Sequence, residues 1–160
     1  MTLDFDTNGH LKPYTAISID LATFGQVFVH GFPQSRTRQG LFDNYLVFME
    51  ELRQVVPSGF QQWINGSFST RKTDPNDLDL VTFLDFETYE AKGDEIEKLR
   101  QVKFNSKGGI DCYFLQVFPE GHRYRIRTQM DTIEWLDLFS HARPRPGQKK
   151  LPKGFVELNF

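Results

Sequence analysis

The feature that most constrains the fold is a pair of aspartates, Asp77 and Asp79, which stand one residue apart at the start of an apolar run. The pair lies within the stretch from Trp63 to Leu84, where an apolar approach, a Gly66-Ser67 turn and a polar loop precede the acids. Side chains alternate between the two faces of a strand, so a strand here places both carboxylates on one face and the flanking leucines in the core. The fold must therefore set two acids at the edge of a core.

Length and composition favour one folded domain. The chain has 160 residues, of which 39% are hydrophobic and 14% aromatic, and a chain of this size can bury about two-thirds of its unfolded surface around one core. The net charge of -2 implies no global field for polyanions, so any basic surface must be local. Cys112 is the only cysteine, which excludes an intramolecular disulfide and a cysteine-based zinc site.

The N-terminal residues and the hydropathy pattern predict a cytoplasmic protein with no membrane partner. The first ten residues carry acids where a secretory signal carries bases followed by an apolar stretch. No stretch approaches the ~18 apolar residues that a membrane span requires. The sequence leaves the oligomeric state open.

Hydrophobic periodicity predicts a single α+β domain over residues 1–160 with a small sheet at its centre. We expect a helical N-terminal part over about 17–56, a sheet region over about 60–118, and a C-terminal helix, basic loop and strand over about 122–160. The predicted helices are one capped by Ser18 and ended at Gly31-Phe32-Pro33, one from about Thr37 to Val56, one over Glu87–Val102, and one opened by Asp131 with Glu134 as its capping-box partner. The predicted strands are Phe60–Asn65, Asp77–Phe86, a buried Ile110–Phe118 and a final Phe155–Phe160, with an extended segment over 122–127 that places three arginines on one face.

A third acid, Asp111, stands near the start of a later predicted strand. Same-face residues are ~6.6 Å apart along a strand and neighbouring strands are ~4.8 Å apart, so Asp77, Asp79 and Asp111 can converge if the strands pair suitably. Hard oxygen ligands select Mg²⁺ or Mn²⁺, and paired metals can clamp the oxygens of an in-line phosphoryl displacement. Gly66 permits a close backbone approach, and the Ser67 hydroxyl can hold phosphate oxygens.

The Gly66-Ser67 pair, nine intervening residues, the Asp77-Leu78-Asp79-Leu80 run and a later strand with an acid resemble the nucleotidyltransferase superfamily with the DNA polymerase beta fold. The whole chain, with its helical start and its Lys153-Gly154 strand, looks like the small uncharacterised bacterial nucleotidyltransferase-like proteins. The resemblance implies a mixed central sheet flanked by helices, and Asp77, Asp79 and Asp111 as metal ligands. It further implies Asp111 as a base, Gly66 and Ser67 as phosphate-holding residues, and Arg71 or Lys72 as the cation that small members place after the turn.

The resemblance implies Mg²⁺-dependent transfer of a nucleoside monophosphate from an NTP, with ATP as the first candidate, to a hydroxyl of a protein, an RNA or a small molecule. Family analogy suggests a toxin–antitoxin or phage-defence setting. One alternative is a module of the same fold that binds nucleotide or a partner without turnover. Another is a structural protein whose exposed final strand, residues 155–160, pairs with a second chain.

The sequence also allows simpler interpretations of the same residues. Asp77 can continue the Asp74-Pro75-Asn76 turn and Asp79 can lie on a solvated strand face, although aspartate is depleted in strands. The basic segments over 123–127 and 143–153 are either solvated surface or cations that steer a triphosphate or a nucleic-acid backbone. Cys112 is most simply a small buried residue, and the histidines show no metal-ligand spacing.

Overall fold

The centre of the protein is a five-stranded mixed sheet in the order β3-β7-β4-β5-β6. The computed structural model describes residues 3–101, 109–144, 146–147 and 149–160. The strands are β3 (Ala16–Ser18), β7 (Phe155–Asn159), β4 (Gln61–Asn65), β5 (Leu78–Asp85) and β6 (Ile110–Val117). The β3–β7 and β5–β6 pairs are parallel, whereas β4 runs antiparallel to both of its neighbours. A short antiparallel hairpin, β1 (Asp4–Phe5) and β2 (Leu11–Lys12), stands apart from this sheet.

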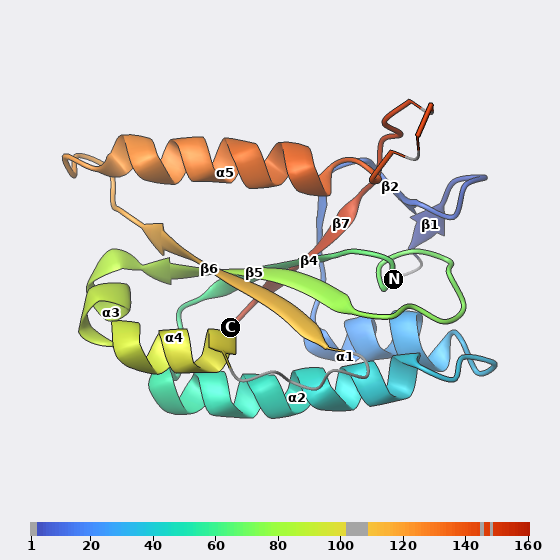
Figure 1. Ribbon diagram of the computed structural model, residues 1–160, viewed down its shortest axis with the longest axis horizontal. Coiled ribbons are helices and arrows are strands. Elements are labelled where there is room, and N and C mark those ends of the chain that lie inside the picture. The colour runs from blue at the N-terminus through green and yellow to red at the C-terminus, as the bar shows by residue number, and fades with distance from the viewer. Residues whose placement is uncertain (1–2, 102–108, 145, 148) are drawn as a thin grey trace.

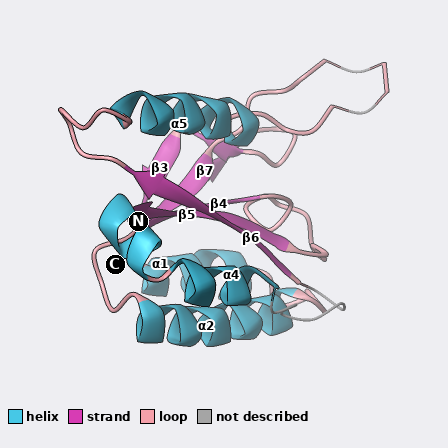
Figure 2. Ribbon diagram, turned by 60° about the vertical axis from the view of Figure 1, so that its left-hand side comes forward, coloured by secondary structure: helices cyan, strands magenta, loops and turns pink. Residues whose placement is uncertain are grey.

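Helices cover both faces of the sheet, as Figures 1 and 2 show. One face carries α1 (Leu21–Gly25), the π-helical turn η1 (Gln26–His30) that continues it, α2 (Arg38–Val55) and α4 (Gly93–Gln101). The other face carries α5 (Arg125–Phe139), and the short helix α3 (Phe86–Ala91) follows the end of β5. The sheet is thus the middle layer of three.

The alternation of side chains along β5 divides the core in two. Leu78 and Leu80 are fully buried in the larger cluster, beneath α1, α2 and α4. Val81 and Phe83 belong to a second cluster of buried residues with Trp63, Phe139 and Phe155, beneath α5. Because the period of a strand is two, Asp79 lies on the face that α5 covers. The leucines on either side of Asp79 point into the core, as the sequence predicted.

Arg38, the first residue of α2, is the most unusual member of the core, because only 1% of it is exposed. Its guanidinium donates four hydrogen bonds of 2.6–2.8 Å, all to backbone carbonyl oxygens: those of Phe28, Phe68, Thr70 and Lys72. The rings of Phe32 and Phe68 lie 3.9 and 5.0 Å from the guanidinium carbon. Burial lowers the pKa of Arg38 to about 10, so the group is charged at neutral pH.

Arg38 therefore fixes the loop between β4 and β5 onto the helical layer. Three of its four acceptors lie in that loop, and the neighbouring residues add further bonds. The backbone N–H of Arg36 donates to Asp74 at 2.7 Å, and the Thr37 hydroxyl donates to the Pro75 carbonyl at 2.7 Å. The loop that carries the chain from the Gly66 turn to Asp77 is held by the start of one helix.

The coarse prediction of an α+β domain with a central sheet flanked by helices is confirmed, and the sheet is mixed. The predicted helix from Thr37 to Val56 corresponds to α2, and the predicted strands that contain Trp63, Leu80 and Val156 correspond to β4, β5 and β7. The sequence did not predict β1, β2 or β3, which are two or three residues long. Strands this short show no alternation that could be recognised.

The start of the first helix was predicted wrongly. Ser18 belongs to β3, and the cap is Asp20, whose carboxylate accepts a 2.6 Å hydrogen bond from the Thr23 N–H. The predicted helix over Glu87–Val102 is two helices, since α3 ends at Ala91 and α4 starts at Gly93. Val102, Lys107 and Gly108 lie outside the described residues.

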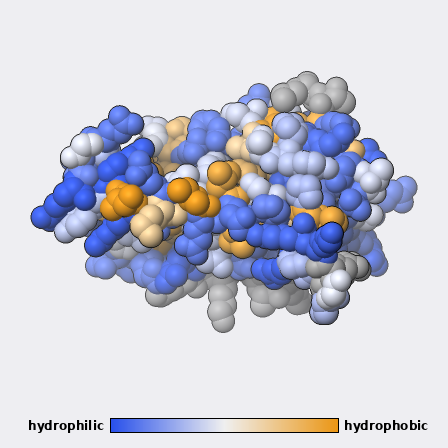
Figure 3. Space-filling view, turned by 90° about the horizontal axis from the view of Figure 1, so that it is seen from above, coloured by the Kyte–Doolittle hydropathy of each residue, from blue (hydrophilic) through white to orange (hydrophobic). Residues whose placement is uncertain are grey.

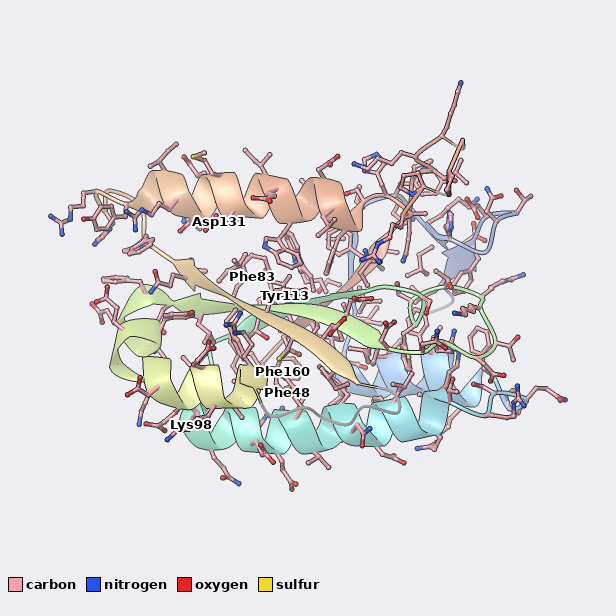
Figure 4. All side chains as sticks on the ribbon, viewed as in Figure 1. Phe48, Phe83, Lys98, Tyr113, Asp131 and Phe160 are labelled. Carbon is pink, nitrogen blue, oxygen red and sulfur yellow. The ribbon has the colours of Figure 1, made fainter. Side chains whose placement is uncertain are left out.

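The predicted extended segment over 122–127 and the helix start at Asp131 are wrong. α5 begins at Arg125, so Asp131 lies within the helix (Figure 4). The reason is tertiary: the Arg125 guanidinium donates to the Phe118 carbonyl at 2.8 Å, and the Phe118 N–H donates to the Thr128 hydroxyl at 2.9 Å. These bonds tie the first turn of α5 to the end of β6.

Two strand environments also differ from the predictions. β6 was expected to be buried, but it is an edge strand of the sheet, with Tyr113 45% exposed. β7 lies between β3 and β4, and both of its edges are paired within the chain. This pairing contradicts the alternative in which the final strand is free to join a second chain.

We expect Arg38→Met to lower the free energy of unfolding by roughly 3 kcal/mol or more, because the change leaves buried carbonyl groups without donors. Urea unfolding followed by circular dichroism measures this loss. The matched control is Arg36→Met, since Arg36 forms an exposed ion pair with Asp74, and pairs of that kind contribute less than about 1 kcal/mol. Equal losses in the two variants would show that the four buried bonds do not anchor the loop.

Candidate functional site

An open cleft of about 720 Å³ lies where β4 ends and where β5 and β6 begin. Its lining includes Gly66, Ser67, Asp77, Asp79 and Asp111. The opposite wall comes from the C-terminal end of α5 and from the segment that leads into β7. The structure therefore brings five residues singled out in the sequence to one cleft, although they come from three separate parts of the chain.

The sheet register sets the positions of the acids. Asp79 pairs with Asp111 across the parallel β5–β6 ladder and with Asn65 across the antiparallel β4–β5 ladder. Residues in register on neighbouring strands share a face, so Asp79 and Asp111 both lie on the α5 side. Asp77 immediately precedes β5 and lines the same cleft.

The three carboxylates interact electrostatically. The pKa of Asp79 is raised to about 6, first by burial and then by the negative charges of Asp77 and Asp111, while Lys153 and Arg143 oppose the shift. Asp111 is exposed and Asp79 is partly buried. A carboxylate whose pKa is raised by like charges is typical of functional sites and gains most from a cation.

The donor chemistry suits a hard divalent cation, since the acids offer carboxylate oxygens alone. Within the described part of the chain, however, no group of three or more His, Cys, Asp or Glu side chains is arranged so that it could hold a metal ion. Asp77, Asp79 and Asp111 therefore share the cleft without forming a complete ligand set at one point. Any bound Mg²⁺ would need oxygen ligands from a substrate or water besides those of the protein.

Gly66, in the turn, packs directly against one of the acids, Asp79. Its φ of +74° is one that L-residues rarely adopt, and a Cβ placed on it would lie 1.8 Å from Asp79 Oδ2. Both the backbone conformation and the carboxylate packed against it therefore favour glycine here. The sequence pattern of a glycine turn before two acids reflects this direct contact between Gly66 and Asp79.

Side-chain hydrogen bonds support the turn after Gly66. The Thr70 hydroxyl donates to the Ser67 carbonyl at 2.7 Å, and the Ser69 hydroxyl donates to Asn65 Oδ1 at 3.3 Å. The Asn65 amide in turn donates to the Phe139 carbonyl at 3.0 Å. These bonds connect the turn to the end of α5, the helix that forms the opposite wall of the cleft.

Lys153 is a site residue that the predictions did not assign. It lines the cleft, is only 5% exposed, and its ammonium donates a short hydrogen bond to the Gly66 carbonyl. Burial lowers the pKa of Lys153 to about 8, against the opposing charge of Asp79. In the sequence, Lys153 is recognisable only as a lysine directly before a glycine and a buried strand. Its partner Gly66 lies 87 positions away along the chain, so the sequence does not show their contact.

Further cations line the rim. Arg143, Lys149 and Lys150 belong to the predicted basic loop and line the cleft, although Lys150 also pairs with Asp137 at 2.6 Å. Arg145 and Gln148 lie outside the described residues. The other basic segment, over 123–127, lies at the start of α5, at the far end of the helix from the cleft (Figure 1).

Arg71 and Lys72 do not line the cleft, so the structure gives them no place beside the acids. The Arg71 guanidinium lies over the Phe5 ring at 5.2 Å. The Lys72 carbonyl accepts a hydrogen bond from Arg38. The cations that line the cleft come from the C-terminal part of the chain: Arg143, Lys149, Lys150 and Lys153.

An aromatic wall completes the cleft. Tyr113 of β6 and Trp135 of α5 both line it, and their ring centroids lie 4.8 Å apart with an interplanar angle of 52°. Tyr113 stands two residues after Asp111 on the same face of β6. Leu138 and Phe139 add apolar surface beside this pair.

The chain belongs to a family of unknown function, DUF6932, whose model matches residues 3–159. Comparison with curated proteins and with solved structures gave no match. Among the described residues, no helix combines the length and the apolar character that crossing a bilayer requires.

We expect Gly66→Ala to destabilise the protein and to displace the Asp79 carboxylate, because backbone strain adds to the overlap with Asp79. Gly121→Ala is the matched control: its φ is +82°, yet nothing lies within 4 Å of the added Cβ. Strain alone costs roughly 1–2 kcal/mol, so Gly66→Ala should exceed the control in urea unfolding. Equal costs would contradict the contact between Gly66 and Asp79.

Proposed function

We propose that this protein is a Mg²⁺-dependent nucleotidyltransferase with a polymerase beta-like fold, which transfers a nucleoside monophosphate from an NTP to an acceptor hydroxyl. The observation that carries the proposal is the single cleft that combines the Gly66-Ser67 turn with Asp77, Asp79 and Asp111. Strand β4, the Gly66-Ser67 turn and the antiparallel strand β5, in which Asp79 pairs with Asn65, support this fold assignment. Asp79 and Asp111, which lie in register on the parallel strands β5 and β6, add to that support.

Asp77 and Asp79 would hold Mg²⁺ or Mn²⁺, and triphosphate oxygens would complete the coordination that the protein alone does not provide. The bound cation supplies charge stabilisation to the transferring phosphoryl group. The Gly66-Ser67 turn offers backbone N–H groups and a hydroxyl to the phosphate oxygens. The protein's own contribution is to position these groups before the nucleotide arrives.

Asp111 is suited to the proton transfer. It is exposed on the edge strand β6, where an acceptor can approach from solvent. In the transfer step the acceptor oxygen attacks the α-phosphorus, the bond between that phosphorus and the bridging oxygen breaks, and pyrophosphate leaves. The hydroxyl proton passes to the Asp111 carboxylate, which acts as general base.

Lys153 and the rim cations would balance the charge of the triphosphate. Lys153 is fixed by its bond to Gly66, so its ammonium stays beside the turn. Arg143, Lys149 and Lys150 line the open side of the same cleft. Cations grouped at the mouth of a cleft raise the local concentration of an anionic substrate.

The Tyr113–Trp135 wall is the surface we assign to the nucleobase. Aromatic faces stack on every base with little discrimination, and this pair lies on the same side of the sheet as Asp79 and Asp111. ATP is the first candidate NTP by family analogy, and the acceptor would be a hydroxyl of a protein, an RNA or a small molecule. A cytoplasmic toxin–antitoxin or phage-defence setting rests on that analogy alone.

A second candidate function is a catalytically silent module that binds nucleotide or a partner. One observation favours it: in the described residues, the three acids do not form a three-ligand metal group. Both candidates use the same cleft. They differ in whether pyrophosphate is released.

With labelled NTPs, Mg²⁺ and candidate acceptors, we expect label transfer by the wild-type protein and a loss of at least about 100-fold in Asp77→Asn/Asp79→Asn, because these acids hold the cation. Asp43→Asn, on the exposed part of α2, is the control and should retain transfer. Transfer that survives the double substitution would refute the site. Binding by calorimetry without pyrophosphate release would select the silent module.

We expect addition of NTP and Mg²⁺ to quench tryptophan fluorescence through stacking near Trp135. The two tryptophans provide the control: Trp135→Phe should lose the quench and Trp63→Phe should keep it, because Trp63 is only 7% exposed and donates to Glu157. Tyr113→Ala should weaken binding about tenfold. Nucleotide binding that leaves Trp135 fluorescence unchanged would place the base elsewhere.

A further inference from the structure

The outer side of α5 exposes a row of large apolar side chains. Ile126, Met130 and Ile133 are 59%, 63% and 67% exposed, and their spacing of four and three residues places them in one line along the helix. Leu136, 42% exposed, borders the row. Figure 3, which looks down on this side of the molecule, shows apolar atoms in a broken line among hydrophilic ones.

This row is not the side of α5 that packs on the sheet. The inward side carries Thr128 and Phe139, which are 6% and 4% exposed. At 100° per residue, Ile126, Met130 and Ile133 lie opposite these two residues. Large apolar side chains that are grouped and exposed in this way mark a surface that a partner covers.

The charges beside the row indicate what covers it. Arg127 flanks its N-terminal end, and Glu134 flanks its C-terminal end on the same side of the helix. Arg123, which precedes α5, lies with Arg127 over the Tyr124 ring, at 4.5 and 4.4 Å. Asp137 continues the acidic end; it pairs with Lys150, yet its side chain is 61% exposed.

We propose that two copies of this chain pair through α5, antiparallel, about a two-fold axis near Met130. In this arrangement Ile126 packs against the region of Ile133 of the second copy, and Met130 meets its equivalent. The arginines of each copy face the acids of the other, because a two-fold axis perpendicular to the helices keeps the same side of each row together. Parallel pairing about an axis along the helices would place Arg127 and Glu134 of the two copies on opposite sides of the helix pair, where neither meets an opposite charge.

The expected dimer is weak and reversible. α5 has 15 residues, so it is about 22 Å long, and one such helix pair buries less than the roughly 800 Å² per partner of a standard interface. Trp135 and Phe139 face the sheet, so pairing leaves the cleft open. The proposal is independent of the cleft's chemistry.

Sedimentation velocity over a range of about 10–500 µM tests the proposal, since weak pairs associate in that range. The wild-type protein should shift from monomer towards dimer as concentration rises, and Met130→Glu should stay monomeric because it places two carboxylates at the axis. Val47→Glu, at a position on α2 that is 47% exposed, is the matched control and should still dimerise. Far-ultraviolet circular dichroism verifies that each variant is folded.

A charge exchange identifies the antiparallel register. Arg127→Glu and Glu134→Arg should each weaken the dimer, and the double variant should restore it. A wild-type protein that stays monomeric at every concentration would overturn the proposal and leave the row for a different protein partner. A dimer that persists in Met130→Glu would show that the copies pair through another surface.

Discussion

The buried Arg38 guanidinium is the interaction on which the arrangement of the cleft depends. A single side chain at the start of α2 satisfies four backbone carbonyl groups, three of them in the loop between β4 and β5. That loop begins at the Gly66 turn and ends at Asp77, so both ends of the candidate site are set by it. Loop backbone rarely survives burial without partners, and here one cation and the residues beside it provide them.

The fold brings opposite charges together in the cleft, where three aspartates and Lys153 lie. Asp79 lies against a glycine and near two other acids, and Lys153 contacts the same turn from the segment that precedes β7. The raised pKa of Asp79 and the lowered pKa of Lys153 have burial as their first cause. Shifts of this kind mark groups whose protonation responds to the charges placed beside them.

Several features of the fold and the site could be predicted because their causes are local. The leucines beside Asp79 and the apolar periodicity of α2 identified a strand and a helix, and the glycine before the acids identified the turn. Other features could not be predicted. The start of α5 is set by bonds to Phe118 at the end of β6, and the burial of Arg38 requires carbonyl groups from residues up to 34 positions away. The secondary-structure propensity of a residue contains no information on contacts with residues so far away in the sequence.

By itself, the sequence determined which residues have chemistry to offer: two acids one residue apart, a third on a later strand, a glycine turn and a basic C-terminal loop. Only the tertiary structure decided that Asp79 and Asp111 stand in register and that β7 is an interior strand. It also placed Lys153, and not Arg71 or Lys72, in the lining of the cleft, and turned the apolar row of α5 outward. The physical reason is that alternation and helical period assign a side chain to a face, whereas strand order and register decide which faces meet.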